Sequence, residues 1–312
     1  MTKILIYGSK GWIGGLIKGY INENTNNNNP TQYELPEDLM LIDGKSRVDN
    51  VDELETEIKL VKPDHIICVI GRTHGTYNGQ YIGTIDYLEN PGCLFENIRD
   101  NLFCPMSLVF IAKKLNIHLT YMGTGCIFEY DESHPFGKEE NGFKEESLPN
   151  FFGSSYSVVK GFTDRLMHLC EDNVLNVRIR MPITHEINKR NFITKITSYE
   201  KICSIPNSMS NLIELIPIMI DMVIKKDSGT INLVNPGLIS HNEVLELYKE
   251  IVDNEFSWKN FTIEEQSAIL SSGRSNNYLD TSKLEELYPD VSNIKESVRT
   301  VLELMKRQYN DE

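Results

Sequence analysis

A tyrosine and a lysine four residues apart, Tyr156 and Lys160, form the pair in this sequence best suited to acid–base chemistry. On a helix, residues at this spacing lie on one face. A neighbouring ammonium group lowers the pKa of a phenol, which lets it exchange a proton with a substrate oxygen near neutral pH. Thr124 can hydrogen-bond the same oxygen from the end of a strand. The spacing alone is common by chance, so an exposed Tyr/Lys pair without function is the simpler interpretation until other features join it.

A glycine-rich turn near the N-terminus is the second feature with a chemical meaning. It follows the expected strand Ile4–Tyr7 and precedes an expected helix. Small residues there let the backbone approach a pyrophosphate, and the helix N-terminus offers amide donors and a positive potential. The arrangement predicts dinucleotide binding, whereas a tight strand–helix turn without a ligand is the alternative. The expected cofactor-binding residues of this turn are Gly8, Ser9, Lys10, Gly11, Trp12, Ile13 and Gly14.

The end of the second expected strand bears on the choice between NAD and NADP. Lys45 and Arg47 can hold a ribose 2′-phosphate, whereas Asp43 can accept a hydrogen bond from the 2′-hydroxyl of NAD. Two cations against one acid favour NADPH, with Arg47 as the candidate ligand, and leave NADH open. A solvated turn of mixed charge is the simpler alternative.

Strand and helix signals alternate through residue 125, which is typical of a parallel α/β sheet. A long loop rich in glycine, proline and charge is expected over Glu129–Phe152, and an asparagine-rich surface loop over Asn22–Pro30. The expected strands are Ile4–Tyr7, Leu39–Ile42, Ile66–Ile70, Leu119–Met122, Val177–Arg180 and Thr230–Val234, and the expected helices are Leu16–Asn22, Val51–Val61, Cys93–Leu115 and Tyr156–Leu169.

We therefore predict an α/β fold with a Rossmann-like doubly wound parallel sheet and a smaller, mostly helical substrate-binding part. Residues 1–180 are expected to form the NADP-binding domain, with part of 215–240 returning to it. Residues 181–312 are expected to be mainly the substrate-binding domain.

Composition limits the classes of function. The 312 residues carry 31 basic and 45 acidic side chains, a net charge of −14, which disfavours a general nucleic-acid or anionic-membrane binder. A local basic pocket for one phosphorylated ligand is still allowed. The six cysteines are spread singly without a CxxC pair, so we expect reduced thiols, no metal site and a cytoplasmic protein. Neither a signal-peptide pattern nor an apolar run of the ~20 residues that span a bilayer is present.

The sequence resembles the extended short-chain dehydrogenase/reductase family in the order of its chemical features along the chain. These features are the glycine turn, Asn101, Thr124, Tyr156 and Lys160. The resemblance implies Asn101, Thr124, Tyr156 and Lys160 as a catalytic tetrad. It also implies that Lys160 contacts the nicotinamide ribose. The stretch Arg274–Leu284 is similar to a motif of the dTDP-4-dehydrorhamnose reductases.

Longer strings resemble the plant-type bifunctional UDP-4-keto-6-deoxyglucose 3,5-epimerase/4-reductases, which make UDP-L-rhamnose. The resemblance covers nearly the whole chain and implies epimerisation at C3 and C5 followed by NADPH-dependent reduction at C4. The asparagine-rich loop and the segment around His74 depart from it, and His74 is assigned no role. The segments that carry it are Gly123–Asp131, Gly142–Glu146, Pro149–Ser154, Arg180–Ile183, Arg190–Ile196, Ile205–Met209 and Asn235–Glu243.

Epimerisation needs a base and an acid that reach protons on ring carbons. Simple reductases of this kind carry Thr-Asp-Tyr where this chain has Thr124-Gly125-Cys126. A thiolate at Cys126 is a competent base if nearby cations lower its pKa. Lys195, one helical turn after Asn191, is the candidate partner acid, and the resemblance implies this Cys/Lys pair. A buried packing thiol and a solvated lysine are the simpler alternatives.

The substrate is expected to be a UDP- or dTDP-linked 4-keto-6-deoxy sugar, supplied by a separate 4,6-dehydratase, and the protein is expected to be a homodimer. Arg274, with Asn191 and Lys201 as further candidates, could bind the diphosphate, although a surface salt bridge is the simpler role for Arg274. A 4-reductase fed by another epimerase, or a non-catalytic NADP-sensing protein, are alternative functions. A 4,6-dehydratase is disfavoured because such enzymes carry Thr-Asp-Glu at this strand end.

Overall fold

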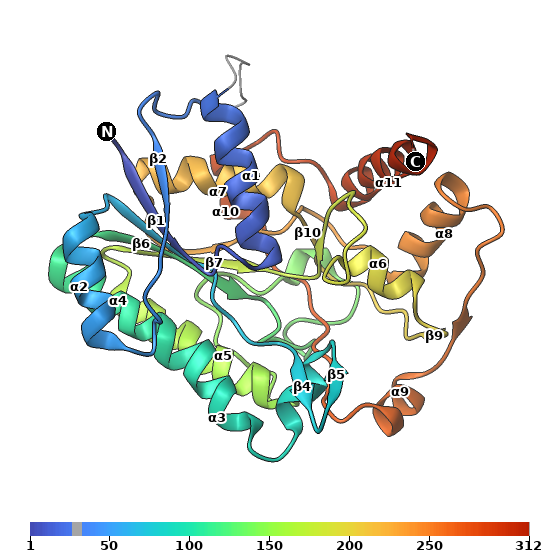
Figure 1. The fold of residues 1–312 in the computed structure, drawn as a ribbon. Coiled ribbons are helices and arrows are strands. Elements are labelled where there is room, and N and C mark those ends of the chain that lie inside the picture. Colours follow the sequence, from blue (N-terminus) through green and yellow to red (C-terminus); the bar gives the residue numbers. More distant parts are fainter. Residues whose placement is uncertain (27–32, 312) are drawn as a thin grey trace. The chain divides into compact units, whose positions relative to one another are not determined.

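The computed structural model describes residues 1–26 and 33–311 (Figure 1), so part of the expected asparagine-rich loop lies outside the described residues. The chain divides into two compact units. Unit 1 comprises residues 1–124, 154–178 and 216–231, and unit 2 comprises residues 125–153, 179–215 and 232–312. Residues 125–153, counted with the nucleotide-binding part in the sequence analysis, thus make most of their contacts within unit 2.

Unit 1 is built on a six-stranded sheet with the strand order β11-β7-β6-β3-β1-β2. β1 pairs in parallel with both β2 and β3, and β3 pairs in parallel with β6. The chain order reverses on either side of β1, which makes the carboxyl ends of β1 and β3 the expected ligand-binding edge of a doubly wound sheet. The strands are β1 (Lys3–Tyr7), β2 (Met40–Asp43), β3 (His65–Cys68), β6 (His118–Thr124), β7 (Val174–Ile179) and β11 (Gly229–Asn232).

Helices cover both faces of this sheet, which confirms the predicted α/β fold (Figure 1). One face carries α1 (Trp12–Asn26) and α7 (Leu212–Lys225), and the other carries α2 (Val51–Val61), α4 (Cys104–Leu115) and α5 (Ser155–Met167). The strands read as continuous apolar runs because both of their faces are buried. On the α2/α4/α5 face, Leu5 and Tyr7 of β1 pack in one cluster with Leu54, Ile58 and Leu108.

Two expectations about helices in unit 1 need correction. The single helix expected over 93–115 is instead α3 (Cys93–Ile98), a π-helical turn (Arg99–Phe103) and α4. Helix α1 begins at Trp12 and continues to Asn26, so it includes the first five residues of the expected asparagine-rich loop. Asparagine only weakly opposes an established helix. The sequence analysis also missed an antiparallel hairpin, β4 (Gly75–Tyr77) and β5 (Gln80–Ile82), and the 3₁₀ turns Ile85–Glu89 and His168–Cys170.

The regular secondary structure of unit 2 is mainly helical, and its core is formed by α6 (Phe192–Thr197), α8 (His241–Ile251) and α11 (Ile294–Asp311). Its only paired strands among the described residues are two short parallel pairs, β8 (Pro182–Ile183) with β10 (Ser210–Asn211) and β9 (Lys201–Ile202) with β12 (Lys259–Asn260). The helices are α6 (Phe192–Thr197), α8 (His241–Ile251), α9 (Ile263–Ile269), α10 (Ser282–Leu287) and α11 (Ile294–Asp311), with a 3₁₀ turn at Glu139–Asn141.

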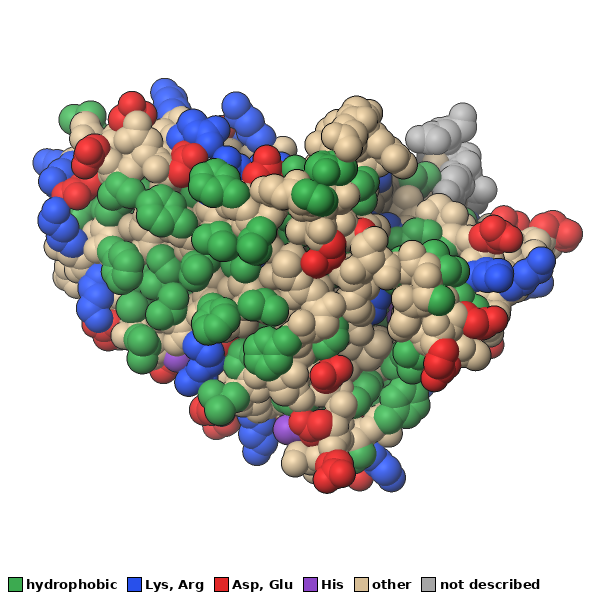
Figure 2. Space-filling model, turned by 90° about the horizontal axis from the view of Figure 1, so that it is seen from below, with side chains coloured by type: hydrophobic (Ala, Val, Ile, Leu, Met, Phe, Trp, Pro, Cys, Tyr) green, Lys and Arg blue, Asp and Glu red, His purple; other side chains and the backbone are tan. Residues whose placement is uncertain are grey.

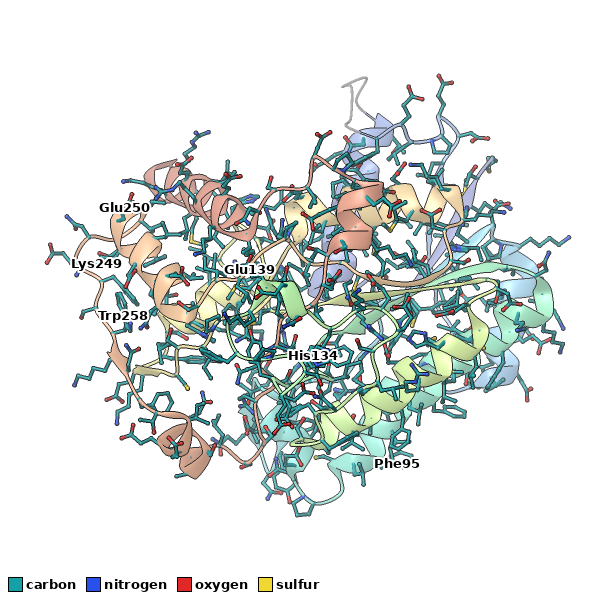
Figure 3. All side chains as sticks on the ribbon, turned by 180° about the vertical axis from the view of Figure 1, so that it is seen from behind. Phe95, His134, Glu139, Lys249, Glu250 and Trp258 are labelled. Carbon is teal, nitrogen blue, oxygen red and sulfur yellow. The ribbon has the colours of Figure 1, made fainter. Side chains whose placement is uncertain are left out.

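Local sequence explains where these helices start. Capping boxes begin α8 and α9, where Ser240 pairs with Glu243 and Thr262 with Glu265. Trp258 lies beside α8, and its Nε1 donates a hydrogen bond to Asn242 at 2.9 Å (Figure 3). Within the described ranges, no helix is both long and apolar enough to cross a membrane.

Candidate active site

The glycine turn in unit 1 leaves no room for side chains at two of its positions. Gly8 has φ +93° and leads from β1 into the turn, and a Cβ atom there would lie 2.9 Å from the carbonyl carbon of Val69. A Cβ atom on Gly14 would lie 2.4 Å from the Gly8 carbonyl oxygen. The turn closes with a hydrogen bond from the Gly11 amide to that same oxygen at 3.0 Å. The backbone is therefore exposed as a cradle at the N-terminus of α1, which suits a pyrophosphate.

Side chains of the turn differ in their availability. Ser9 is buried, Lys10 and Gly11 are exposed, and Ile13 is half-buried. The buried Trp12 Nε1 has no hydrogen-bond partner among the residues that the structure describes. Because a buried donor without an acceptor costs free energy, this N–H fits a site that a ligand acceptor completes.

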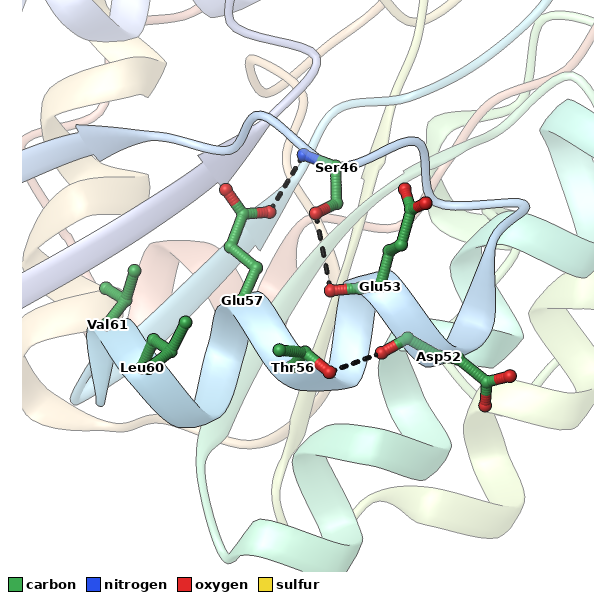
Figure 4. A pocket seen from close by; sticks show the side chains of 7 residues that line it. All are labelled: Ser46, Asp52, Glu53, Thr56, Glu57, Leu60 and Val61. Carbon is green, nitrogen blue, oxygen red and sulfur yellow. Dashed lines mark hydrogen bonds between the residues drawn. The ribbon is translucent and has the colours of Figure 1, made fainter.

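The loop after β2 is held by Glu57 of α2 (Figure 4). The carboxylate accepts hydrogen bonds from the Lys45 and Ser46 amides at 2.7 and 2.9 Å and from the Tyr7 hydroxyl at 2.8 Å. Burial raises the pKa of Glu57, but these hydrogen bonds outweigh it and leave the pKa lowered. Beside this loop lies an open hollow of about 570 Å³ whose lining includes Asp52 and Glu53, so its charge does not favour a phosphate.

The charged side chains at the end of β2 have partners in this structure. Asp43 accepts a hydrogen bond from Lys18 at 2.7 Å, which lowers the pKa of Asp43. Arg47 is largely exposed and makes two hydrogen bonds to Asp49, at 2.9 and 2.7 Å. Asp43 is thus neutralised by a lysine, whereas the exposed Arg47 would have to exchange the half-buried Asp49 carboxylate for a ligand phosphate.

Lys160 joins α5 to strand β6. Its ammonium group is buried, donates to the Tyr121 hydroxyl and to the Met122 carbonyl at 3.2 Å, and lies 4.4 Å from the centre of the Tyr121 ring. Tyr156 is half-buried in the first turn of α5, on the same face as Lys160. Thr124 is buried at the end of the strand that Lys160 contacts. α5 and β6 therefore bring these three residues to one end of the sheet.

Asn101 lies in the π-helical turn and is fully buried. Its side-chain amide donates to the Arg72 carbonyl at 2.8 Å and to Asn97 at 2.9 Å, and its Oδ1 accepts from the Arg72 amide at 2.9 Å. Its backbone carbonyl accepts from Thr163 of α5 at 2.7 Å. Since both amide hydrogens have protein acceptors, Asn101 connects the segment after β3 to α5.

In unit 2, Cys126 lies beside a buried arginine. Arg180 donates to the Cys126 Sγ at 3.5 Å and is 1% exposed. The other five cysteines, at 68, 93, 104, 170 and 203, are all buried, whereas Cys126 is half-buried. Cys126 is thus the thiol best placed to meet a ligand.

Lys195 of α6 interacts electrostatically with Cys126 and with two arginines. Burial lowers the pKa of Lys195, and the charges of Arg190 and Arg274 lower it further, while Cys126 raises it. An ammonium group with a lowered pKa gives up its proton more readily, which suits a general acid. This cationic group contrasts with the net charge of −14 of the whole chain and suits a phosphorylated ligand.

The three residues expected to bind the substrate diphosphate differ in their surroundings. Arg274 is half-buried and donates to the Ser272 carbonyl at 3.0 Å and to the Ser272 hydroxyl. Asn191 is fully buried: it caps α6 through the Ile193 amide, and its amide group donates to the Thr184 and Glu186 carbonyls, both at 2.7 Å. With these contacts it has no donor left for a ligand, so we leave it out of the substrate site. Lys201 is exposed on β9.

Three residues of the candidate site were not identified from the sequence. Arg190 belongs to the cations around Lys195, Arg180 contacts Cys126, and Tyr121 contacts Lys160. Arg190 and Arg180 do lie inside strings that carry the family resemblance, which was the available signal. Tyr121 gave none, because an aromatic residue in a strand indicates packing.

Comparison with known proteins places the chain among sugar-nucleotide enzymes, although no protein-family model matches it. It is 52% identical over 306 residues to the L780 protein of Acanthamoeba polyphaga mimivirus, covering 98% of this chain and 99% of that protein. The solved structure of L780, described as a UDP-rhamnose synthase, superposes with a TM-score of 0.88 over 97% of this chain and 99% of that one, at 50% identity.

A second relative is the bifunctional dTDP-4-dehydrorhamnose 3,5-epimerase/reductase of Arabidopsis thaliana, 42% identical over 295 residues and covering 94% of this chain and 90% of that protein. A dTDP-4-dehydrorhamnose reductase structure from Clostridium acetobutylicum shares the fold, with a TM-score of 0.76 at 16% identity over 98% and 100% of the two chains. The chain therefore belongs to the extended short-chain dehydrogenase/reductases, in the family of bifunctional nucleotide-sugar 3,5-epimerase/4-reductases.

Proposed function

We propose that the chain converts UDP-4-keto-6-deoxyglucose to UDP-L-rhamnose by 3,5-epimerisation and NADPH-dependent reduction of the 4-keto group. The observation that carries this proposal is the cationic surround of Cys126, which a simple 4-reductase does not need. Unit 1 is then the cofactor-binding part and unit 2 mainly the substrate-binding part. Thr124 and Cys126 are separated by one residue, so their Cα atoms are at most about 7 Å apart.

Reduction uses the residues of α5 and β6. The Tyr156 hydroxyl and Thr124 hold the C4 oxygen, where negative charge develops, and Tyr156 supplies the proton to that oxygen. Lys160, fixed by Tyr121 and Met122, provides the positive charge that helps the phenol to give up its proton. Asn101 positions α5 through Thr163. When bound, the nicotinamide supplies the hydride to C4.

Epimerisation uses Cys126 and Lys195. The protons on C3 and C5 are acidic because both carbons adjoin the C4 carbonyl, so loss of either gives an enolate. The Cys126 thiolate takes the proton from one face of the carbon, and the Lys195 ammonium returns a proton to the opposite face. This exchange leaves a thiol and a neutral amine, which recover their starting states by passing one proton through water.

The chain uses a nicotinamide cofactor, and we propose that NADPH is preferred. The glycine cradle and the partnerless Trp12 Nε1 fit a dinucleotide on unit 1. Asp43 is neutralised by Lys18, while Arg47 is exposed and can turn from Asp49 to a 2′-phosphate. The residues proposed to hold the cofactor are Gly8, Ser9, Lys10, Gly11, Trp12, Ile13, Gly14, Arg47 and Lys160.

The diphosphate is proposed to bind at Arg274 and Arg190, with the exposed Lys201 as an outer contact. Guanidinium groups bind phosphate in a bidentate manner, and the field of both arginines already reaches Lys195. We propose uridine as the nucleoside because the chain is more similar to the L780 UDP-rhamnose synthase than to the Arabidopsis enzyme named for dTDP. The 4-keto-6-deoxy sugar is the product of a 4,6-dehydration, so the reaction is placed after a dehydratase step.

We also propose that the chain forms a homodimer through unit 1. Apolar side chains gather on the face seen in Figure 2, and Phe95 of α3 points away from the molecule (Figure 3). An apolar surface over two long helices is typical of an interface. A second copy is the expected occupant, and a Phe95→Glu/Phe110→Glu double variant should sediment as a monomer. The exposed members of this face are Leu94, Phe95, Ile98, Phe103, Phe110, Phe162, Leu166 and Leu169.

The test is NADPH consumption with two substrates, UDP-4-keto-6-deoxyglucose and the pre-epimerised UDP-4-keto-rhamnose, with the products identified by chromatography against authentic UDP-L-rhamnose. We expect the wild-type chain to convert both to UDP-L-rhamnose and the Tyr156→Phe variant to convert neither. Conversion of the pre-epimerised substrate alone would leave a 4-reductase only. Cofactor binding without turnover of UDP- or dTDP-linked substrate would favour a sensor.

A further inference from the structure

Arg180 is a buried guanidinium group without a carboxylate partner. Arg178, two residues earlier, is equally buried but pairs with Asp164 through two hydrogen bonds of 2.8 Å. Arg180 donates instead to the Ser275 carbonyl at 2.5 Å and hydroxyl at 3.0 Å, to Asn207 Oδ1 at 2.5 Å, to the Gly125 carbonyl at 3.4 Å and to Cys126 Sγ at 3.5 Å. Within residues 1–26 and 33–311, no carboxylate forms an ion pair with it.

A guanidinium group stays charged in proteins, so burying it without a counter-charge is costly. Four of its five acceptors are neutral and cannot ionise. Burial lowers the pKa of Arg180, and Cys126 and Tyr130 are the groups that raise it. Cys126 and Tyr130 are therefore the two groups acting on Arg180 that can ionise to an anion.

Tyr130 is a poor candidate for this anion. Its hydroxyl donates to the Pro206 carbonyl at 2.8 Å, a bond that only the neutral phenol can make. Burial, opposed by Arg180, raises the pKa of Tyr130 to about 12. The remaining titratable neighbour, His241, has a pKa lowered by burial to about 4, so it adds no charge near neutral pH.

The other charged groups around Cys126 are also cations. Lys195 of α6 interacts electrostatically with Cys126, and the charges of Arg190 and Arg274 act on Lys195. The charge of Glu139 acts on Tyr130, whose pKa it helps to raise. A thiolate at Cys126 is thus an anion that can pair directly with Arg180, whose Nη1 lies 3.5 Å from the sulfur.

We propose that Arg180 is a positioning residue for the epimerase half-reaction, holding Cys126 Sγ as a thiolate aimed at the substrate. This inference rests on the proposed epimerase function of Cys126. A charged donor binds an ionised acceptor more strongly than a neutral one, so the Arg180–Cys126 contact favours S⁻ over SH. Since Asn207 and Ser275 fix the guanidinium, the sulfur is held in one direction as well as ionised.

Each inversion is balanced in this scheme. The S–H bond forms as the C–H bond at C3 or C5 breaks, and the electron pair of that C–H bond moves into the enolate. The Lys195 ammonium then protonates the opposite face of the carbon. The proton on sulfur passes through water to the neutral Lys195 amine, which leaves the thiolate beside Arg180 for the second carbon. Arg180 neither gains nor loses a proton.

The test compares wild type with Arg180→Gln and Arg180→Lys. The rate of Cys126 alkylation by iodoacetamide is followed against pH, and the modified peptide is identified by mass spectrometry, since the other five cysteines are buried. In Arg180→Gln we expect alkylation at pH 6 to slow by about tenfold or more, because the thiolate fraction falls. In the same variant, deuterium exchange at C3 and C5 should slow by the same factor as alkylation, while reduction of the pre-epimerised substrate should stay within about twofold of wild type. Arg180→Lys should recover part of the alkylation rate and part of the exchange rate.

Lys189→Gln is the matched control, because it removes an exposed cation from the loop that precedes α6 and should leave both readouts unchanged. Should Arg180→Gln fail to fold, the ultraviolet difference spectrum between wild type and Cys126→Ser measures the thiolate directly, and it should be present at pH 6. An unchanged alkylation profile in a folded Arg180→Gln, or no thiolate signal until about pH 8.5, the value of a free thiol, overturns the proposal. If wild type shows the thiolate but no ring exchange, the epimerase function fails and the Arg180–Cys126 pairing stands.

Discussion

Two adjacent glycines at the start of α1 provide a matched pair of substitutions for the cofactor site. A Cβ atom on Gly14 would lie 2.4 Å from the Gly8 carbonyl oxygen and 2.7 Å from the Ser9 Cα, both rigid backbone atoms, whereas a Cβ atom on Gly15 meets nothing within 4 Å. Gly14→Ala must therefore displace the turn. This should lower the free energy of unfolding by about 1–3 kcal/mol, the usual effect of adding a group to a closely packed site. Gly15→Ala should stabilise the exposed helix position by about 1 kcal/mol.

The two variants are compared by NADPH titration and by thermal unfolding without cofactor. Gly14→Ala should weaken NADPH binding by at least about tenfold, equivalent to 1.4 kcal/mol, because the amides around the cradle move. Gly15→Ala should bind NADPH as wild type does and unfold about 2 °C higher. If Gly14→Ala binds NADPH within twofold of wild type, the cofactor does not rest on this turn.

Three further predictions concern charge. Lys195→Met should abolish deuterium exchange at C3 and C5 while sparing reduction of the pre-epimerised substrate. The control is Lys249→Met, which alters an exposed lysine of α8 and should leave both rates within about threefold of wild type. Loss of exchange in both variants would deny Lys195 a special role. Arg47→Ala should reduce the preference for NADPH over NADH by about tenfold, measured as the ratio of kcat/KM values, and an unchanged ratio would remove Arg47 from the site. Burial lowers the pKa of His65 to about 4 in the folded protein. As the pH falls below about 6.5, the unfolded chain therefore binds a proton at this histidine before the folded chain does. The free energy of unfolding should fall by roughly 3 kcal/mol between pH 6.5 and 4. Urea unfolding of His65→Phe should show a smaller fall, and an equal fall would contradict this assignment.

The elements of unit 1 could be predicted from sequence because their signals are local. The apolar run Ile4–Tyr7, the glycines after it and the break before the strand at 65 each act within a few residues. The π-helical turn at Asn101 could not be predicted, since the helical pattern runs through it unbroken. The turn is held by contacts from Arg72 and Thr163, 29 and 62 residues away.

The candidate site in unit 2 was only partly visible in the sequence. Cys126 and Lys195 were identified from the resemblance, but their cationic surround depends on Arg180, Arg190 and Arg274, which are far apart in the chain. Asn191 shows a different limit of the sequence. Asparagine three residues before Thr194 reads equally well as a ligand or as a helix cap, and only the geometry shows that it is a cap.

Deuterium labelling can show whether one chain carries out both the 3,5-epimerisation and the 4-reduction. The protein is incubated with UDP-4-keto-6-deoxyglucose and NADPH in deuterium oxide, and the product is examined by NMR. We expect UDP-L-rhamnose with deuterium at C3 and C5 and protium from NADPH at C4. Reduced product with protium at C3 and C5 would contradict it, because the hydride would then have been delivered without any inversion at Cys126 and Lys195.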